Sequence, residues 1–303
     1  MTRGAAVVLL VALSGLGAGV LGAVPLAAQE RMEAYEHAHR AFPEFVDVFF
    51  TQHAYLERKV HPRFDAIVAE AGKQYSESVE LVWQFNRWFG AEIAAAAIQT
   101  DPEVGDGVAG FGDMEVAPMI TFVQDPERLL IVTARSGFVL PTGDESEGLG
   151  VDGWSWRPRF LLWKGFGAER RGALQVEFGY DLSFMEEGDD EKALAFNVGY
   201  SHWTHSNWIP VMEITAVQGV GGHDDEGAVP VDKALMRRGD RRLGLSHGEA
   251  LIESDDRRLS SAVGFRYAFE NGQQWGGGVQ FPLFGDTESY DWRLVFGGIF
   301  HLR

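Results

Sequence analysis

The sequence contains no cysteine. Disulfides therefore cannot stabilise the fold, and neither Cys-ligated iron–sulfur clusters nor covalent c-type haem attachment is possible. Basic residues are also scarce, since 26 Lys and Arg stand against 44 Asp and Glu and give a formal net charge of −18 at pH 7. A surface of that sign repels nucleic acid phosphates, so the composition argues against nucleic acid as a partner.

Long apolar runs are absent except at the N-terminus. There, Arg3 supplies a positive start, an uncharged stretch continues to Leu26, and the small residues Ala27 and Ala28 follow. This layout predicts a secretory signal peptide over residues 1–28 that is cleaved on export. A permanent membrane helix is the alternative, because the run is long enough to span a bilayer. Its Gly and Ala content and its small final residues favour the signal peptide.

Residues 29–54 show helical rather than strand spacing. Apolar side chains recur at intervals of three or four along this stretch, at Met32, Tyr35, Ala38, Phe42 and Phe45. The spacing predicts a short amphipathic helix in a periplasmic N-terminal segment, which either plugs the periplasmic mouth or lies on the membrane. His37 and His39 are two potential metal ligands, but without further ligands they are read as solvated histidines. We expect no metal and no cofactor.

From about Val60 onward, apolar and polar residues alternate in runs of roughly ten, which is the pattern of strands with two different faces. In the run 172–184, for example, Leu174, Val176 and Phe178 share one face, and Gln175 and Glu177 share the other. Twelve strands are predicted in this way, near 58–69, 77–87, 90–99, 113–124, 127–140, 153–165, 172–185, 192–203, 207–218, 258–270, 273–284 and 289–302.

A soluble β-sandwich also alternates, so the connections between strands decide between the two folds. Five are short, at 88–89, 125–126, 166–171, 204–206 and 271–272. The intervening ones are longer and more polar, at 70–76, 100–112, 141–152, 186–191, 219–257 and 285–288. Short turns on the periplasmic side and long loops on the extracellular side are typical of an up-and-down barrel with both termini periplasmic.

Large aromatic residues support the same fold, because they gather near the ends of the predicted strands. They are Trp88, Trp154, Trp156, Trp203, Trp208, Trp275 and Trp292. Trp and Tyr at the ends of lipid-facing strands form the interfacial girdles of outer-membrane barrels. The sequence thus predicts an all-β, antiparallel up-and-down transmembrane β-barrel of about 12 strands over residues 55–303, placed in the bacterial outer membrane.

The C-terminal residues Gly297, Phe300 and Leu302 fit the Gly-x-x-aromatic-x-apolar pattern of the outer-membrane insertion signal, although Arg303 follows where a final aromatic is usual. We therefore expect the insertion machinery as a partner during biogenesis. The other expected partners are outer-membrane lipid, lipopolysaccharide and a small-molecule solute. The acidic loops around 144–147 and 186–191 are read mainly as solvated surface.

Two short motifs carry a family resemblance. Gly110-Phe111-Gly112-Asp113 opens a predicted strand, and Leu140-Pro141-Thr142-Gly143 closes the next one before an acidic loop. With the Gly/Trp-rich stretch 150–159, this pairing resembles the outer-membrane transporter family named for the meta-pathway of phenol degradation. The resemblance covers the chain from about Phe49 to its end and implies a passive channel without naming a solute. The motif glycines, Asp113 and Pro141 are expected to be structural.

If the apolar face meets lipid, the polar face lines the lumen. An arginine on the lipid side near mid-bilayer would cost about 2–4 kcal/mol, so these charges are expected to point inward. The candidates for lumen and constriction are Arg63, Glu80, Glu115, Arg135, Arg157, Arg159, Glu177, Asp181, Glu213, Arg266 and Arg293. The same polar face of the predicted strands also carries Asp65, Gln84, Glu92, Gln280 and Asp291.

Two hypotheses follow for these charges. Either acids and arginines pair across the lumen and hold a narrow barrel together, or Arg157, Arg159 and their acidic neighbours form a selective constriction for polar or aromatic solutes. Both can hold together. The expected function is passive passage of small solutes, possible substrates being aromatic or hydrophobic. The alternative is a non-conducting barrel that displays its acidic loops or scaffolds a periplasmic complex through residues 30–52.

Catalysis is not expected. A Gly-x-Ser-x-Gly match occurs at 244–248, but it lies in the long polar loop, whereas a nucleophile elbow needs a buried strand before the serine and a helix after it. His202 and His205 lie near serines in a predicted turn, which does not make a triad. No phosphate-binding loop and no zinc-ligand spacing is present in the sequence.

Overall fold

The computed structural model describes residues 46–69, 72–103, 105–150, 153–166, 171–185, 192–204, 206–220, 257–285 and 290–302. The chain divides into two compact units, Met1–Pro43 and Glu44–Arg303, and the described residues belong to the second. The predicted signal peptide and the helix expected before residue 46 lie outside the described residues. No helix in the described ranges is long and apolar enough to cross a membrane.

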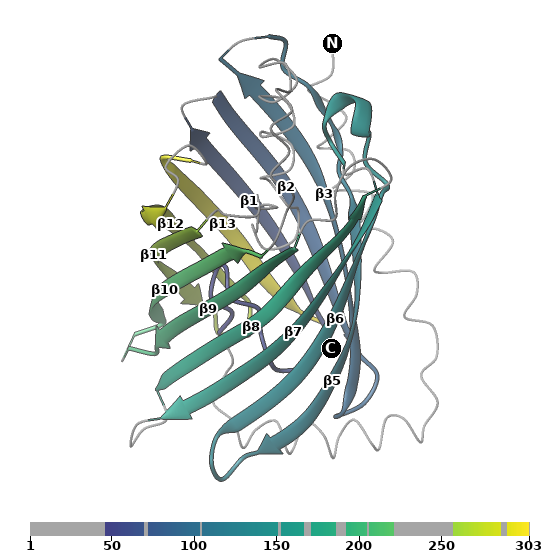
Figure 1. The fold of residues 1–303 in the computed structure, drawn as a ribbon. Coiled ribbons are helices and arrows are strands. Elements are labelled where there is room, and N and C mark those ends of the chain that lie inside the picture. Colours follow the sequence, from purple (N-terminus) through teal and green to yellow (C-terminus); the bar gives the residue numbers. More distant parts are fainter. Residues whose placement is uncertain are drawn as a thin grey trace. The chain divides into compact units, whose positions relative to one another are not determined.

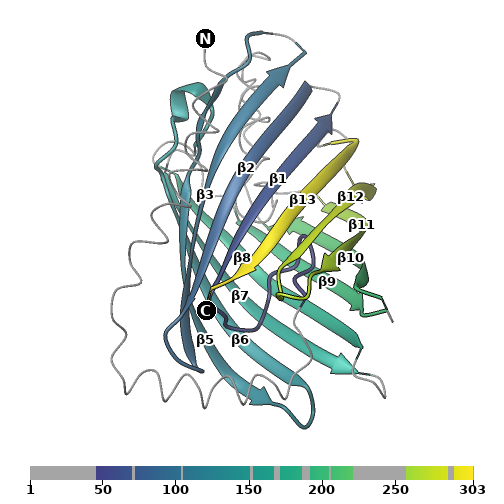
Figure 2. The ribbon, with the colours of Figure 1, turned by 180° about the vertical axis from the view of Figure 1, so that it is seen from behind.

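The second unit is a closed antiparallel barrel (Figures 1 and 2). Within the described ranges its strands are β1 (Lys59–Ala69), β2 (Gly72–Gln84), β3 (Phe89–Pro102), β4 (Ala109–Phe111), β5 (Met114–Asp125), β6 (Leu130–Leu140), β7 (Gly153–Phe166), β8 (Gly172–Met185), β9 (Lys192–His202), β10 (Trp208–Gly219), β11 (Arg257–Ala268), β12 (Gln274–Gly285) and β13 (Trp292–His301). A 3₁₀ turn, η1 (Glu145–Glu147), follows β6.

The barrel closes because β1 pairs with β2 on one side and with β13 on the other. The three-residue strand β4 pairs with the last part of β3, and β5 pairs with the first part of the same edge. β4 and β5 therefore occupy one position in the ring, and the described residues form a barrel of twelve strands. This confirms the predicted fold class.

The observed strands follow the twelve predicted ranges closely, with errors at the first two long connections. The predicted loop 100–112 contains the end of β3 and the short strand β4. The predicted loop 70–76 is wrong, because β2 begins at Gly72 and its first residues pair with β1, as in Gln74↔Ile67 and Ser76↔Asp65. Both faces of this stretch carry polar residues, so the alternation that marks a strand is lost there. Gly72 has a φ of 138°, a conformation that a residue with a Cβ rarely adopts.

The burial pattern of the strands explains why the sequence alternates. Outward side chains include Phe160, Phe178, Phe196, Phe265 and Phe296, each between 44% and 52% exposed. Inward positions of the same strands carry mostly polar and charged groups that are almost fully buried. A wide apolar band on the outside of a closed barrel is stable in lipid and would be a liability in water.

Aromatic pairs lie at both ends of the barrel, as the predicted girdles require. Trp154 stacks on Phe184 with ring centroids 4.2 Å apart, at the end where β7 begins and β8 finishes. At the opposite end, Trp208 meets Tyr267 edge-on at 5.1 Å, and Trp275 meets Phe300 at 5.4 Å. These rings mark the two levels at which an apolar wall passes into polar surroundings.

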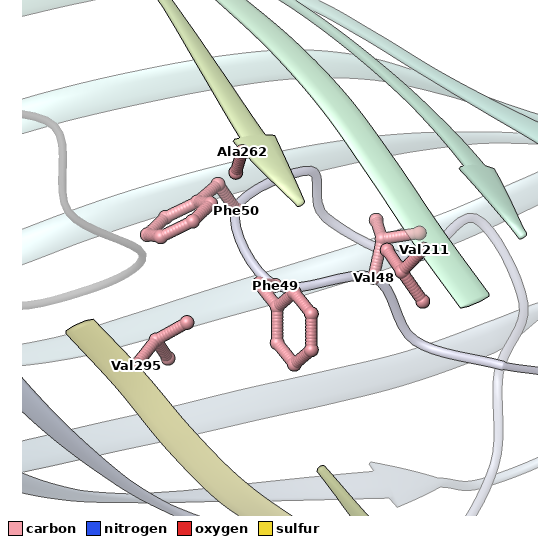
Figure 3. Packing of buried hydrophobic residues seen from close by; sticks show 6 residues of the cluster. All are labelled: Val48, Phe49, Phe50, Val211, Ala262 and Val295. Carbon is pink, nitrogen blue, oxygen red and sulfur yellow. The ribbon is translucent and has the colours of Figure 1, made fainter. Parts of the chain in front are cut away.

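Residues 46–58, here called the lumen segment, precede β1 and run as coil inside the barrel (Figures 1 and 2, purple). Every side chain from Val46 to Leu56 is at most 5% exposed. Phe49, Phe50 and Val48 pack against Val211, Ala262 and Val295 of the wall (Figure 3). The described part of the predicted segment 29–54 is thus neither helical nor on the membrane surface; it fills part of the interior.

Glycines of the wall make room for the lumen segment. A Cβ placed at Gly199 would lie 2.8 Å from Val48, and one at Gly278 would lie 2.9 Å from Phe49. Carbon atoms in ordinary contact are about 3.5–4.0 Å apart, so a side chain at either position would push the segment away. Glycines within the strands therefore serve the packing of the lumen.

Candidate functional site: the barrel lumen

The interior wall carries a chain of ion pairs that begins on β3. Arg135 of β6 lies 2.6 Å from Glu92 of β3 and 2.5 Å from Glu115 of β5. All three side chains are almost fully buried. A Cβ at Gly137 would lie within 2.5 Å of atoms of both Glu115 and Arg135, so this glycine provides the space that the pair occupies.

The chain continues through β7 and β8. Arg157 lies 3.5 Å from Glu115 and 3.8 Å from Asp181. Arg159 lies 2.6 Å from Asp181 and 2.9 Å from Glu177. Positive and negative groups thus alternate along the inner face of five strands, β3, β5, β6, β7 and β8. Each buried charge has an oppositely charged neighbour, which offsets the cost of removing it from water.

A second cluster lies on β1 and β13. Arg63 and Arg293 both bind Asp65, at 2.6 and 2.7 Å. Both guanidinium groups also lie over the ring of Phe50, at 5.1 and 4.8 Å from its centroid. Arg63 donates a further hydrogen bond of 2.6 Å to the carbonyl of Phe49, so this cluster joins the wall to the lumen segment.

Glu213 of β10 binds the backbone of the lumen segment. Its carboxylate accepts hydrogen bonds from the N–H groups of Phe49, Phe50 and Thr51, the last two at 2.9 and 2.8 Å. The hydroxyl of Thr51 donates a fourth, at 3.1 Å. A carboxylate that satisfies three consecutive buried N–H groups replaces the backbone pairing that coil lacks.

Other wall residues bind the same segment on either side of Glu213. Arg266 donates to the carbonyls of Asp47 and Val48, and Gln175 donates to that of Val46 at 2.6 Å. Further along, the N–H of Gln52 donates to Glu177 at 2.8 Å, and Thr133 donates to the carbonyl of Ala54. The segment is therefore held by several strands around the ring.

Asp47 is the charged centre of the lumen segment itself. Its carboxylate lies 2.5 Å from Lys59 and 3.9 Å from His53, and it accepts the hydroxyl of Tyr55. Burial alone would raise the pKa of Asp47, but the positive charge of Lys59, helped by His53 and His61, holds it well below the ordinary value of 3.8. The carboxylate is therefore ionised and paired inside the barrel.

The structure places all eleven sequence-predicted lumen residues in the interior. Each is at most 8% exposed: Arg63, Glu80, Glu115, Arg135, Arg157, Arg159, Glu177, Asp181, Glu213, Arg266 and Arg293. Asp291 is exposed, so its predicted inward position is wrong. It precedes β13, and its N–H donates to the carbonyl of Val68.

The charges pair as the first hypothesis expects, whereas a selective constriction at Arg157 and Arg159 stays a prediction. Two contributors were missed by the sequence reading. Asp47 lies in the predicted N-terminal segment 29–54, after the residues with helical spacing, and Lys59, at the start of β1, points inward to meet it. Nothing in the spacing of these residues indicated that coil would enter the barrel.

The two resemblance motifs form one local structure at the end of β6. Asp113 accepts hydrogen bonds from the N–H groups of Thr142 and Gly143, at 3.0 and 2.8 Å. The hydroxyl of Thr142 accepts the N–H of Met114 at 2.8 Å. A Cβ at Gly150 would lie 2.8 Å from the carboxylate of Asp113. The motifs are therefore structural, and their residues hold the loop after β6 against the start of β5.

Comparison with known proteins shows the fold and no family. No protein-family model matches the chain, and no characterised protein matches it by sequence. Among solved structures, it is similar to the NanC porin, with a TM-score of 0.53, 8% identity, 80% of this chain covered and 100% of that chain. It is also similar to the COG4313 outer membrane channel of Pseudomonas putida F1, with a TM-score of 0.55, 13% identity and coverage of 84% and 99%. The chain thus has the fold of outer-membrane channels.

Proposed function

We propose that this protein is a passive outer-membrane channel for small solutes. The observation that carries the proposal is the contrast between the two faces of the barrel, because an apolar outer band encloses an interior lined by paired charges. A wall that only filled space would be more stable with apolar side chains, since buried ion pairs are costly to desolvate. Charged linings are the usual means by which barrel channels select polar solutes.

The lumen segment sets the width of the proposed path. Its side chains fill space between β10, β11 and β13 (Figure 3), so solutes pass beside it or after it moves. A restricted path agrees with small substrates. The resemblance to the phenol meta-pathway family adds aromatic or hydrophobic molecules as proposed solutes, and membership of that family is itself part of the proposal.

The proposed outer-membrane location implies how the protein is exported and inserted and what it contacts there. We infer export through a cleaved signal peptide at residues 1–28, insertion by the outer-membrane machinery, and contact with lipid and lipopolysaccharide. The outward aromatic pairs at both barrel ends support a membrane position. Catalysis is not proposed.

A second function is favoured by one observation. The four hydrogen bonds from the lumen segment to Glu213 hold coil across the interior, which a non-conducting structural or scaffolding barrel would also require. The two functions differ in what happens when the segment is removed.

Planar-bilayer recording and liposome swelling test the proposal. The full-length protein is compared with a variant in which residues 46–56 are replaced by a Gly/Ser linker, after folding is verified by heat-modifiable migration. We expect small steps from the full-length protein and larger ones from the variant. If neither the full-length protein nor the variant conducts ions or admits solute, the barrel is structural and the channel proposal is wrong. If both conduct, neutralising Arg157 and Arg159 together tests whether they set ion selectivity.

A further inference from the structure

Three metal-binding side chains converge where the lumen segment meets β2 and β3. They are His53 of the segment, Glu80 of β2 and Glu92 of β3. One ligand atom from each lies within 4.8 Å of the other two. The three side chains are 3%, 5% and 1% exposed, so the cluster lies in the barrel interior and not on a solvated acidic surface.

The strand register brings the two carboxylates together. Glu92 is the partner of Val82, and Glu80 lies two residues from Val82 on the same inward face of β2. Residues so related are diagonal neighbours on one face of a sheet, within reach of long side chains. The two carboxylates are therefore brought together by the β2–β3 pairing.

His53 is held opposite these carboxylates by its neighbours in the chain. The N–H of Gln52 donates to Glu177 at 2.8 Å, and the carbonyl of Ala54 accepts the hydroxyl of Thr133. Both residues that flank His53 are thus bound to the wall, on β8 and β6. Preorganised ligands on anchored backbone lose little freedom when they bind an ion.

The donor set indicates which ion the cluster suits. An imidazole nitrogen with two carboxylate oxygens is a mixed set that suits first-row divalent cations, above all zinc, whereas calcium and magnesium prefer oxygen ligands alone. Zinc binds such ligands at about 2.0–2.2 Å, which places tetrahedral ligand atoms roughly 3.4 Å apart. The ligand atoms lie within 4.8 Å of one another, so zinc binding would draw them together by at most about 1.4 Å.

Charged groups lie close to the three side chains. Asp47 lies 3.9 Å from Nδ1 of His53, too far for a hydrogen bond, but its negative charge favours a cation bound by this imidazole. Arg135 holds Glu92 at 2.6 Å while it also pairs with Glu115, so its charge is shared between two acids. The positive charge of Arg135 weakens the attraction of Glu92 for a cation. An ion at this site therefore depends more on the imidazole of His53, which favours an ion that binds imidazole well.

We propose that His53, Glu80 and Glu92 bind one zinc ion that joins the lumen segment to β2 and β3. The site is independent of whether the barrel conducts. Zinc at this position cross-links His53 of the lumen segment to β2 and β3, so it stabilises the docked segment.

The test uses the full-length protein in detergent, stripped with a chelator and titrated with zinc chloride by calorimetry. Bound metal is then counted by mass spectrometry. We expect one zinc per chain, bound at least 100-fold more tightly than calcium. The variants His53→Ala and Glu80→Gln should each weaken binding at least tenfold, and cobalt in place of zinc should give an absorption spectrum that changes in His53→Ala.

Two controls separate this site from other histidines. The double variant H37A/H39A removes the adjacent pair near the N-terminus, and His202→Ala removes a histidine at the end of β9. Both should bind zinc like the unchanged protein. If H37A/H39A abolishes binding, if His53→Ala and Glu80→Gln both leave it unchanged, or if calcium binds as tightly as zinc, the proposal is wrong. Glu80→Gln keeps the side-chain shape, so it provides the decisive comparison if His53→Ala does not fold.

Discussion

Glu213 accepts the backbone N–H of Thr51 at 2.8 Å across 162 residues of sequence. The same carboxylate binds the two preceding N–H groups. We therefore predict that Glu213→Ala leaves three buried donors without an acceptor, at a cost of about 1–3 kcal/mol for each group that water does not reach. The lumen segment should loosen while the barrel persists.

Limited proteolysis checks this first prediction, since cleavage within residues 46–58 should become faster in Glu213→Ala. The matched control is Glu77→Gln, a glutamate of β2 that is not among the buried interior residues. It should be cleaved at the rate of the unchanged protein. Equal protection of Glu213→Ala would show that the other wall contacts suffice to hold the segment.

The close contact between Gly199 and Val48 gives a second prediction. The three atoms nearest to a Cβ at position 199 all belong to Val48, the closest at 2.8 Å. Gly199→Ala should therefore strain the docked segment by roughly 1–3 kcal/mol, as overpacking does, without disturbing strand pairing. Val48→Ala removes the colliding methyl groups and should restore docking in the double variant. A double-mutant cycle on thermal unfolding measures this, and additive effects would contradict the predicted contact.

The sequence predicted the barrel wall well, because lipid outside and charge inside impose a period of two that any strand must follow. The inward positions of charged residues such as Arg135 and Glu177 were predicted from the alternation alone, because the opposite orientation of their strands would place these charges in lipid. The lumen segment could not be found in this way. Its coil is held by side chains far along the chain, such as Glu213 and Arg266, and no local spacing encodes those contacts.

The shared arginine of the wall supports a third prediction. Arg135 pairs with both Glu92 and Glu115, so Arg135→Met removes the nearer cation of two buried carboxylates, while Glu115 keeps Arg157 at 3.5 Å. Breaking such a buried pair typically costs about 3–5 kcal/mol. The midpoint of urea unfolding should fall accordingly. Arg128→Met is the control, because its side chain is 80% exposed and pairs with Asp125 at the surface; it should leave the midpoint unchanged.

The ionised carboxylate of Asp47 predicts how the docked segment depends on pH. Its folded-state pKa is well below 3.8 despite burial, because Lys59, His53 and His61 favour the charged form. A depressed pKa contributes stability that is fully present above the unfolded-state value and is lost as the pH falls through the folded-state value. Docking should thus persist from pH 7 to pH 5 and weaken only below about pH 4. Asp47→Asn should be destabilised at pH 7 and lose this acid dependence; an identical pH profile for both proteins would exclude Asp47 as its origin.

The contact between Asp113 and Gly143 yields the last prediction. Asp113 accepts the N–H groups of Thr142 and Gly143, and Gly150 leaves room for its carboxylate. Asp113→Ala removes the oxygen that accepts both N–H groups, so hydrogen exchange at residues 142 and 143 should become faster while the amides of β6 stay protected. Asp113→Asn keeps one carbonyl oxygen in place and should retain most of the protection. Because these residues belong to the two motifs of the family resemblance, unchanged exchange in Asp113→Ala would mean that the motifs are not held together by this carboxylate. Faster exchange throughout β5 and β6 would instead assign Asp113 to the stability of the wall.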